Sequence, residues 1–319
     1  MSLPLRPLFR LHALRRLAAM VLSRAVMATS AAMFAATSPA LATAQRPPAP
    51  IQVVDGAWLA AHLDDADVVV LQVETDTSAR TARIPGARML HYRALVITRD
   101  GLSSELPSPD SLASLFSGLG IAPGALVVAT TTHEPPMAAR ALMTLDVMGH
   151  PRLAFLSGGV AQWKRDGRPL ATGPARFTRS SYPVRPAAEV VVDAEWISQR
   201  QGRGLALIDT RTDGEFDGTG NRSGMPSEGH PAGARQLQWE QVFANVDLHQ
   251  LQDSVTLRRL YTERMRSGDT LVTYCWVGYR ASMTYVAART LGLPVRFYDG
   301  SYQDWQRRGL PVLKGTERR

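Results

Sequence analysis

The sequence predicts an α/β protein made of two tandem copies of one unit, each a parallel sheet with helices on both faces. Two observations lead to this prediction. Short apolar runs, typical of strands buried on both faces, alternate with helix-like stretches, and the same series of segments then occurs a second time. Strand–helix alternation implies a parallel sheet covered by helices. At 319 residues the chain is long enough for two domains, each with a core of its own.

The first 44 residues are expected to form an export signal. Five arginines and no acidic residue occur in 1–24, and a small apolar segment follows over 25–36. Ala42-Thr-Ala44 then forms an A-x-A cleavage site before a Pro-rich stretch. The apolar segment is too short and too interrupted by Ser and Thr to span a membrane. We therefore expect a periplasmic or secreted protein, with an amphipathic or disordered leader as the alternative.

The segments of the first copy follow in a regular order. A helix is expected to begin after Asp55, which is a typical N-cap residue. The apolar runs 68–73 and 125–129 predict buried strands, and helix-like stretches cover 111–119 and 137–148. This succession predicts one complete unit of sheet and helices.

Five short segments of the first copy reappear in the second copy. Chance similarity between α/β segments is the alternative, and the shared order of five matches argues against it. The matched pairs are Val54–Leu59 with Val192–Ile197, Val68–Val73 with Leu205–Asp209, Ile84–Arg88 with Pro231–Arg235, Ser157–Trp163 with Asp299–Trp305, and Gly167–Pro169 with Gly309–Pro311.

Residues 171–188 separate the two copies. They are rich in Pro, Ser and Arg and predict an extended linker packed across the surface. The chain is therefore expected to consist of a signal peptide over 1–44, a first unit over 51–170, this linker, and a second unit over 189–314.

The net charge of +8 is concentrated at the N-terminus. The five arginines of the leader leave +3 for the rest of the chain. A mildly basic body suits a small anionic substrate and does not require nucleic acid as a partner. The seven histidines are scattered, and none lies at ligand spacing from the single cysteine, so no metal or other cofactor is expected. No stable membrane insertion is expected after cleavage of the signal.

The single cysteine, Cys275, lies between a strand and a helix. Residues 270–274 form an apolar, strand-like run, a loop containing a glycine covers 275–280, and a helix-like stretch follows over 281–291. Backbone N–H groups at the start of a helix favour a thiolate, and so does the positive end of the helix dipole. Arg280 adds a permanent cation at the end of the loop. This arrangement predicts a reactive cysteine, with a buried and inert thiol as the alternative.

Four motifs occur in sequence around this cysteine. They are the Asp-x-Arg end of Leu207–Arg211, the segment Gly229–Arg235, the loop Cys275–Arg280, and Tyr298–Trp305 with its Tyr-Asp-Gly-Ser and Trp. These motifs resemble those of rhodaneses, in which the second reads Gly-His-Ile-Pro-Gly-Ala, and four motifs in the family's order are much more specific than any one alone. The chain is therefore identified as similar to tandem-domain sulfurtransferases of the thiosulfate/3-mercaptopyruvate family, and the resemblance implies five-stranded sheets.

The resemblance implies sulfur transfer through a persulfide on Cys275. A cysteine thiolate is both a nucleophile and a tolerable leaving group. It is expected to take the outer sulfur of a small anionic donor such as thiosulfate and to pass it to cyanide or to a thiol. The protein partner, if there is one, is unknown.

The residues expected to bind substrate surround this thiol. Loop N–H groups are suitable ligands for an anionic sulfur. Arg280 is expected to hold the loop or the charge of the donor. Arg211 is expected to bind the donor's sulfonate as a fork, with a structural ion pair to an acid such as Glu215 as the alternative. Aromatic residues, including Trp239, are candidates for the rim of the pocket or for the core. The complete substrate-binding set is Arg280, Arg211, Trp276, Val277, Gly278 and Tyr279.

Two positions depart from the best-known members of the family. Val277 stands where thiosulfate–cyanide enzymes carry Lys and mercaptopyruvate enzymes carry Ser. Glu215 stands where tandem enzymes often carry a second Arg. Both departures leave the identity of the donor open. The surrounding stretch 213–229 is Gly-rich and polar and is expected to be a mobile surface loop.

The first copy is expected to be inactive. Either Thr131 or Thr132 aligns with Cys275, and neither residue can carry a persulfide. Pro135 and Pro136 follow and stiffen the loop. The expected role of this copy is to wall the active site and to stabilise the second copy.

Two other functions are weighed against sulfur transfer with turnover. A periplasmic sulfur carrier or binding module that does not turn over forms the same persulfide. A Cys-dependent phosphatase has five residues between its Cys and Arg, whereas four separate Cys275 from Arg280, and the smaller loop favours a single sulfur atom. The sheet-and-helix architecture alone does not decide between these functions.

Overall fold

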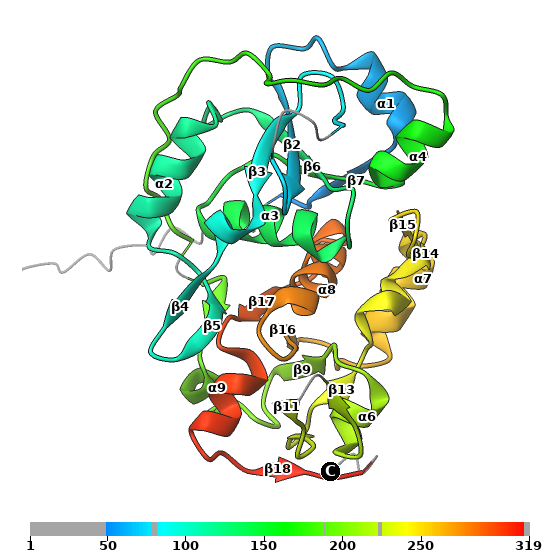
Figure 1. Ribbon diagram of the computed structural model, residues 1–319. Coiled ribbons are helices and arrows are strands. Elements are labelled where there is room, and N and C mark those ends of the chain that lie inside the picture. The colour runs from blue at the N-terminus through cyan, green and yellow to red at the C-terminus, as the bar shows by residue number, and fades with distance from the viewer. Residues whose placement is uncertain (1–48, 78–81, 188, 223–224, 316–319) are drawn as a thin grey trace, which may run out of the picture. The chain divides into compact units, whose positions relative to one another are not determined.

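Two five-stranded parallel sheets form the framework of the protein (Figure 1). The computed structural model describes residues 49–77, 82–187, 189–222 and 225–315. The expected signal peptide, 1–44, lies outside the described residues. The first sheet has the order β1 (Gln52–Val54), β7 (Leu153–Leu156), β6 (Leu126–Thr130), β2 (Val68–Glu74) and β3 (Arg88–His91). The second has the order β8 (Val191–Val192), β17 (Val295–Tyr298), β16 (Thr270–Tyr274), β9 (Leu205–Asp209) and β13 (Arg235–Gln236).

The strand order is the same in both sheets, which confirms the predicted fold class of two repeated α/β units. In the first copy the helices are α1 (Gly56–Ala61), α2 (Pro109–Gly118), α3 (Pro136–Val147) and α4 (Gly159–Arg165). In the second they are α5 (Ala194–Ser198), α6 (Asp213–Asp217), α7 (Ser254–Thr262), α8 (Tyr279–Thr290) and α9 (Ser301–Arg307). Single 3-10 turns are η1 (Tyr92–Leu95) and η2 (Trp239–Val242).

Four short antiparallel pairs complete the described secondary structure. They are β4 (Ile97–Arg99) with β5 (Leu102–Glu105), β10 (Asn221–Arg222) with β11 (Met225–Pro226), β12 (His230–Pro231) with β18 (Val312–Leu313), and β14 (Phe243–Asn245) with β15 (Gln250–Leu251).

Equivalent aspartates start the first helix of each copy. The side chain of Asp55 accepts a hydrogen bond from the Trp58 N–H at 2.7 Å, and Asp193 accepts one from the Trp196 N–H at 2.7 Å. Each bond satisfies one N–H group that the first turn of a helix leaves without an intrahelical partner. The N-cap predicted at Asp55 is therefore confirmed.

The strands are apolar along their whole length because both faces of each sheet are covered. In β2, Val69 and Leu71 belong to one core cluster, whereas Val70, between them, belongs to another. In β9, Ile208 and Leu207 divide between two clusters in the same way. Continuous apolar runs are typical of such doubly covered parallel strands.

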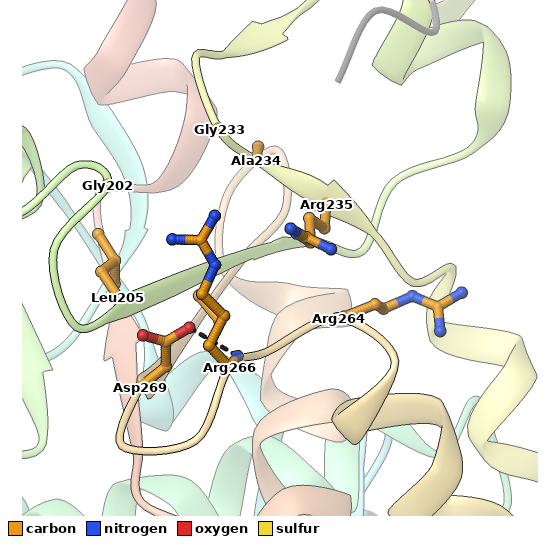
Figure 2. A pocket seen from close by; sticks show the side chains of 9 residues that line it. Gly202, Leu205, Gly233, Ala234, Arg235, Arg264, Arg266 and Asp269 are labelled. Atoms are coloured by element: carbon orange, nitrogen blue, oxygen red, sulfur yellow. Dashed lines mark hydrogen bonds between the residues drawn. The ribbon is translucent and has the colours of Figure 1, made fainter. Parts of the chain in front are cut away.

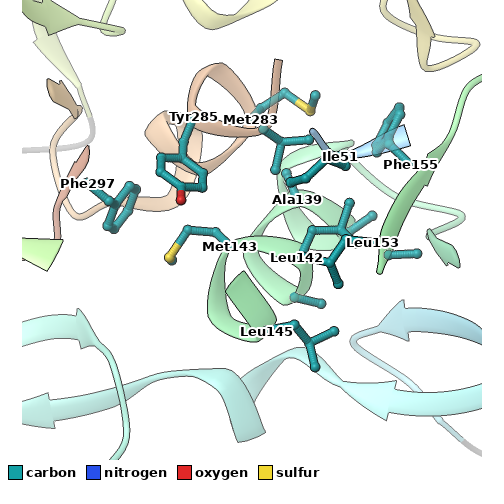
Figure 3. Packing of buried hydrophobic residues seen from close by; sticks show 14 of the residues in the cluster. Ile51, Ala139, Leu142, Met143, Leu145, Leu153, Phe155, Met283, Tyr285 and Phe297 are labelled. Atoms are coloured by element: carbon teal, nitrogen blue, oxygen red, sulfur yellow. The ribbon is translucent and has the colours of Figure 1, made fainter. Parts of the chain in front are cut away.

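Helices α3 and α8 pack against each other and give the two copies a common core. Figure 3 shows Met143 of α3 next to Tyr285 of α8. Within this core the Tyr285 hydroxyl donates to the carboxylate of Asp146 at 2.6 Å. Arg289 of α8 donates to the same carboxylate from Nε at 2.6 Å. Buried charge between the helices is thus paired and hydrogen-bonded.

Each copy also places a hairpin on the other. In the β4–β5 hairpin, the Ser103 N–H donates to Oε1 of Gln303 in α9 at 3.1 Å. In the β14–β15 hairpin, the Leu251 N–H donates to Oγ of Ser157, just before α4, at 3.2 Å. The two acceptors lie in the matched segments 299–305 and 157–163. No helix in the described part of the chain is both long and apolar enough to cross a membrane.

Candidate active site

Cys275 is the first residue after β16, and only three further residues separate it from α8. The helix begins at Tyr279, two residues earlier than predicted, so Arg280 lies in its first turn and not in the loop. The reason is Gly278, which has φ +82° and acts as the N-cap of α8. This backbone conformation is accessible to glycine at little cost. A side chain at this position would also meet Nη1 of Arg140 and the ring of Phe297 at 3.1 Å.

The thiol is buried, with 1% of Cys275 exposed, and the loop is held from one side by α9. The main-chain carbonyls of Cys275 and Trp276 accept hydrogen bonds from the N–H groups of Tyr302 and Gln303 at 3.0 and 3.1 Å. The Cys275 N–H donates to Oγ of Ser301 at 3.4 Å. Ser301 itself has φ +52°, a strained value for a residue other than glycine, of the kind that clusters at functional sites.

Three consecutive main-chain donors follow the thiol. Among the residues that the structure describes, the N–H groups of Trp276, Val277 and Gly278 have no hydrogen-bond acceptor. Such groups, next to the start of a helix, are suited to bind an anion. The loop therefore offers N–H groups to a negatively charged sulfur on Cys275.

Arg280 is paired with Glu215 in a buried fork. Its Nη1 and Nη2 donate to the two carboxylate oxygens at 2.7 and 2.8 Å. Glu215 also accepts from the main-chain N–H of Thr212 at 3.1 Å, which completes the capping box of α6, and from the Thr212 hydroxyl at 2.9 Å. Burial opposes ionisation of Glu215, but the bonds from Arg280 and Thr212 outweigh it and lower the pKa of Glu215 to about 2. Whether Arg280 also holds the charge of the donor stays a prediction.

The described part of the stretch 213–229 contains regular secondary structure where a loop was predicted. It contains α6 and the β10–β11 pair, and Glu215 is only 2% exposed. The prediction of a mobile surface loop over this stretch is therefore wrong at α6. The physical reason is the capping box, together with the buried partner that Arg280 offers to a residue of this helix.

Arg211 does not face a binding pocket. It is fully buried, and its Nε and Nη2 both donate to the carboxylate of Asp209, at distances of 2.6 to 3.1 Å. Nη2 also donates to the Gly229 carbonyl at 2.8 Å, and the guanidinium lies 3.8 Å from the centre of the Tyr302 ring. The expectation that Arg211 binds the donor is corrected to the alternative, a structural ion pair, and its partner is Asp209, not Glu215.

The aromatic and apolar residues of the loop divide between core and rim. The Trp276 ring is buried against Tyr302 in the core of the second copy, so an indole contact with substrate is not supported. Val277 packs against the same core. Tyr279 is partly exposed and meets the ring of Tyr92, from the first copy, edge to face at 5.5 Å. Trp276 and Val277 thus offer main-chain N–H groups to an anion at the loop, whereas their side chains pack in the core.

A cavity of about 410 Å³ adjoins the end of the loop. Its wall includes Arg280 and Trp239, and it contains three carboxylates, those of Glu134, Glu215 and Glu240. Arg280 is the single guanidinium in this wall. The cavity is therefore acidic, which sequence reasoning did not anticipate.

The first copy contributes a buried arginine beside the loop, which sequence reasoning missed. Arg140 of α3 is fully buried, and its Nη2 donates to the Ser104 carbonyl at 2.8 Å and to Asp299 at 3.0 Å. Its Nε and Nη1 have no hydrogen-bond partner among the described residues. Asp299 belongs to the Tyr-Asp-Gly-Ser motif, but nothing in the sequence connects this motif with a residue so far away in the chain.

Two titratable groups of the first copy share this environment. Burial raises the pKa of Tyr92 to about 12, with Arg140 opposing and Cys275 adding to the shift. Burial and the nearby Asp299 raise the pKa of Glu105 to about 7. At neutral pH Tyr92 therefore keeps its proton and Glu105 is only partly ionised.

In the equivalent loop of the first copy, side chains of the same copy accept hydrogen bonds from loop N–H groups. Strand pairing ends at Thr130 in β6 and at Tyr274 in β16, so Thr131 holds the position of Cys275. The Thr132 N–H donates to Glu74 at 2.8 Å, and the His133 N–H donates to the Thr131 hydroxyl at 3.1 Å. A carboxylate and a hydroxyl thus occupy the first two N–H groups that follow Thr131. Within the described residues, no three His, Cys, Asp or Glu side chains come together as a metal site.

Comparison with known proteins places both copies in one family. The model of the rhodanese-like domain matches residues 55–166 and 193–308. A sulfur carrier protein of Thermus thermophilus is 30% identical over 288 residues, which cover 84% of this chain and 98% of the relative. A thiosulfate sulfurtransferase of Azotobacter vinelandii is 26% identical over 262 residues, covering 79% of this chain and 93% of the relative.

A solved structure shares the fold of this chain. The structure of SseA, a 3-mercaptopyruvate sulfotransferase from Escherichia coli, superimposes with a TM-score of 0.65 at 23% identity. The match covers 79% of this chain and 99% of SseA.

The Glu215–Arg280 pair predicts a specific dependence of stability on pH. Replacing Glu215 by Gln leaves a buried guanidinium without its counter-charge, which should cost about 3–5 kcal/mol. The pKa of Glu215 is about 2 in the folded protein against 4.5 for the free group, so its stabilisation is present above pH 4.5 and is lost as the pH falls towards 2. Urea unfolding of Glu215→Gln and of the parent protein should therefore differ by a constant amount above pH 4.5 and converge below it.

The control is Glu189→Gln, which removes a carboxylate that is 82% exposed and pairs with Arg296. It should change the free energy of unfolding by less than about 1 kcal/mol. A Glu215→Gln variant as stable as this control would contradict the account, and so would a difference that persists unchanged to pH 2.

Proposed function

The chain belongs to the rhodanese family and is a tandem-domain sulfurtransferase of the rhodanese kind, and from this premise we propose that Cys275 carries the sulfur as a persulfide. The proposed reaction takes sulfane sulfur from thiosulfate, or from a related donor, and delivers it to cyanide or to a thiol.

The difference between the two loops carries this proposal. In the first copy Glu74 and Thr131 take up the first two N–H groups of the loop, those of Thr132 and His133. In the second copy the N–H groups of Trp276 to Gly278 have no acceptor in the described structure, and they follow a thiol. A persulfide anion supplies the acceptor that this loop lacks.

The proposed chemistry has two half-reactions. In the first, the Cys275 thiolate attacks the outer sulfur of thiosulfate, a new S–S bond forms, and the old S–S bond breaks with its electron pair leaving on sulfite. In the second, an acceptor thiolate or cyanide attacks the terminal sulfur of the persulfide. The bond to Cys275 then breaks and its thiolate is regenerated. No net oxidation and no cofactor is needed in this cycle.

The charge of an anionic donor is proposed to be met by main-chain groups. Arg211 and Arg280 are both paired with carboxylates of their own copy, Asp209 and Glu215. The loop N–H groups and the N-terminal end of α8 are then the donor-facing positive charge of the second copy. Relatives are named for thiosulfate and for 3-mercaptopyruvate, and among these we propose thiosulfate or a related sulfane compound.

A sulfur carrier without rapid turnover is the second candidate. A relative with 30% identity is named a sulfur carrier protein. Both functions use the same persulfide and differ in the rate of its release.

Steady-state turnover tests the proposed function. Purified protein should release thiocyanate from cyanide with at least one donor in a panel of thiosulfate, mercaptopyruvate and polysulfide. Cys275→Ser should abolish this turnover, because a hydroxyl cannot carry sulfane sulfur. The matched control, Thr131→Ser in the first copy, should retain it. Turnover that survives in Cys275→Ser would contradict the proposal, whereas persulfide formation without turnover would select the carrier.

We also propose that the protein is exported and cleaved after Ala44. Support comes from the arginine-rich start, the short apolar segment and the A-x-A site. The intact mass of protein isolated from the periplasmic fraction should match a chain that begins at Gln45. Recovery of the protein from the cytoplasm with its first 44 residues attached would contradict export.

A further inference from the structure

Two segments of the first copy meet the helices that hold the Cys275 loop. The β4–β5 hairpin lies against α9 (Figure 1), and the Leu106 N–H, just after β5, donates to Oδ2 of Asp299 at 2.7 Å. In η1, the ring of Tyr92 meets the ring of Tyr279 edge to face at 5.5 Å. Because Tyr279 is the first residue of α8, four residues after the thiol, Tyr92 lies at the first turn of this helix.

Arg140 connects the β4–β5 hairpin to the loop itself. It is fully buried, and its Nη2 donates to the Ser104 carbonyl in β5 at 2.8 Å and to Asp299 at 3.0 Å. Its Nη1 lies 3.1 Å from the position that a Cβ on Gly278 would take. Ser104 has φ +61°, a strained value for a residue other than glycine, and such strain clusters at functional sites. A strained hairpin residue of the first copy is thus held against the loop of the second.

The Tyr92 hydroxyl faces this junction. Burial raises the pKa of Tyr92 to about 12, and four charged or polar groups around its oxygen shift the pKa further. Arg140 and Ser104 lower the pKa, whereas Cys275 and Asp299 raise it. The hydroxyl therefore keeps its proton at neutral pH and is a hydrogen-bond donor. Tyr92 is half-buried, so packing orients its ring while part of the side chain remains open to solvent.

The hydroxyl of Tyr92 is near the thiol but is not bonded to it. The charge on Cys275 contributes to the pKa of Tyr92, yet these two described residues share no hydrogen bond. A persulfide lengthens the side chain of Cys275 by one S–S bond of about 2 Å and carries its negative charge on the outer sulfur. The outer sulfur therefore extends beyond the thiol and comes within the range of donors that the thiol does not reach.

The arginines of the second copy are paired with carboxylates or lie far from this sulfur. Arg211 and Arg280 are each paired with a carboxylate of their own copy. Figure 2 shows a third arginine, Arg266, in the wall of a separate cavity of about 280 Å³. That cavity adjoins Asp269, just before β16, whereas Cys275 follows the other end of this strand, about 17 Å away at the rise of a strand. A side-chain donor from the first copy therefore adds what these arginines do not supply.

We propose that Tyr92 is a catalytic residue of this site and that its hydroxyl donates a hydrogen bond to the outer sulfur of the Cys275 persulfide. The inference rests on the persulfide of the proposed function and adds a side chain of the first copy to the loop N–H groups of the second. When the thiolate takes the outer sulfur of thiosulfate and sulfite leaves, negative charge develops on that sulfur. A donor placed there stabilises the persulfide more than the thiolate. Tyr92 keeps its proton throughout, so the step needs no further reactant.

An equilibrium measurement on Tyr92→Phe tests this proposal, because Phe keeps the ring contact with Tyr279 and removes only the hydroxyl. Parent and variant are equilibrated with the same mixtures of thiosulfate and sulfite, and intact mass gives the fraction of protein that carries the persulfide. The equilibrium constant for persulfide formation should fall by about tenfold or more in the variant, the factor expected for one hydrogen bond to a charged group. A purely structural role would slow both directions equally and leave this constant unchanged.

The matched control is Tyr182→Phe. The Tyr182 hydroxyl, in the linker, bonds to Nδ1 of His150 at 3.0 Å, and His150 contacts the Ala125 carbonyl, at the other end of β6 from Thr131. This variant should melt at a lower temperature than the parent, because it loses a buried hydrogen bond, but it should keep the parent's equilibrium constant. Equal constants for the parent and folded Tyr92→Phe would overturn the inference and leave the persulfide intact. A parent protein that takes up no sulfur from any donor would instead overturn the proposed function, and this inference with it.

Discussion

The packing of α3 against α8 is the constraint on which the rest of the structure depends. Residues 138–146 of α3 and 280–289 of α8 are buried on every side, and a helix buried all round needs protein on both of its faces. Each helix covers the sheet of its own copy with one face and meets the other copy with the opposite face. Because α8 begins at the Cys275 loop, this packing also fixes the position of the thiol. The first copy is therefore needed for the site even though it has no thiol.

The loops of the two copies follow equivalent strands, but only the loop of the second copy begins with a thiol. In the first copy the Glu74 carboxylate ends the strand next to the loop and takes up a loop N–H group. In the second copy the carboxylate that follows the corresponding strand is that of Glu215. It lies in the next helix, α6, and pairs with Arg280. Because the Glu215 carboxylate bonds to Arg280 and not to the loop, the N–H groups that follow Cys275 remain available to an anion. The adjoining cavity is acidic because Glu134 and Glu240 add two carboxylates to the Glu215–Arg280 pair, which distinguishes this site from one that attracts dianions by side-chain charge.

Sequence patterns predicted what depends on local chemistry and periodicity. The repeated strands, the Asp55 cap and the cysteine between strand and helix are local features, and the structure contains them. The errors concern the direction of side chains within a short motif and a contact between the two copies. Asp209 lies two residues before Arg211 and takes up its guanidinium, yet a motif of alternating residues does not reveal the direction of either side chain. Arg140 reaches the loop from the other copy, which only the packing of α3 on α8 makes possible.

The central claim is that Cys275 accepts a sulfur atom, and intact-protein mass spectrometry tests it most directly. The protein is treated with thiosulfate, freed of excess donor, and measured before and after addition of cyanide. The account predicts a mass increase of one sulfur atom, located on the peptide that contains Cys275, and its complete loss with cyanide. An unmodified Cys275 with every sulfane donor, or the same mass increase in Cys275→Ser, would contradict the account.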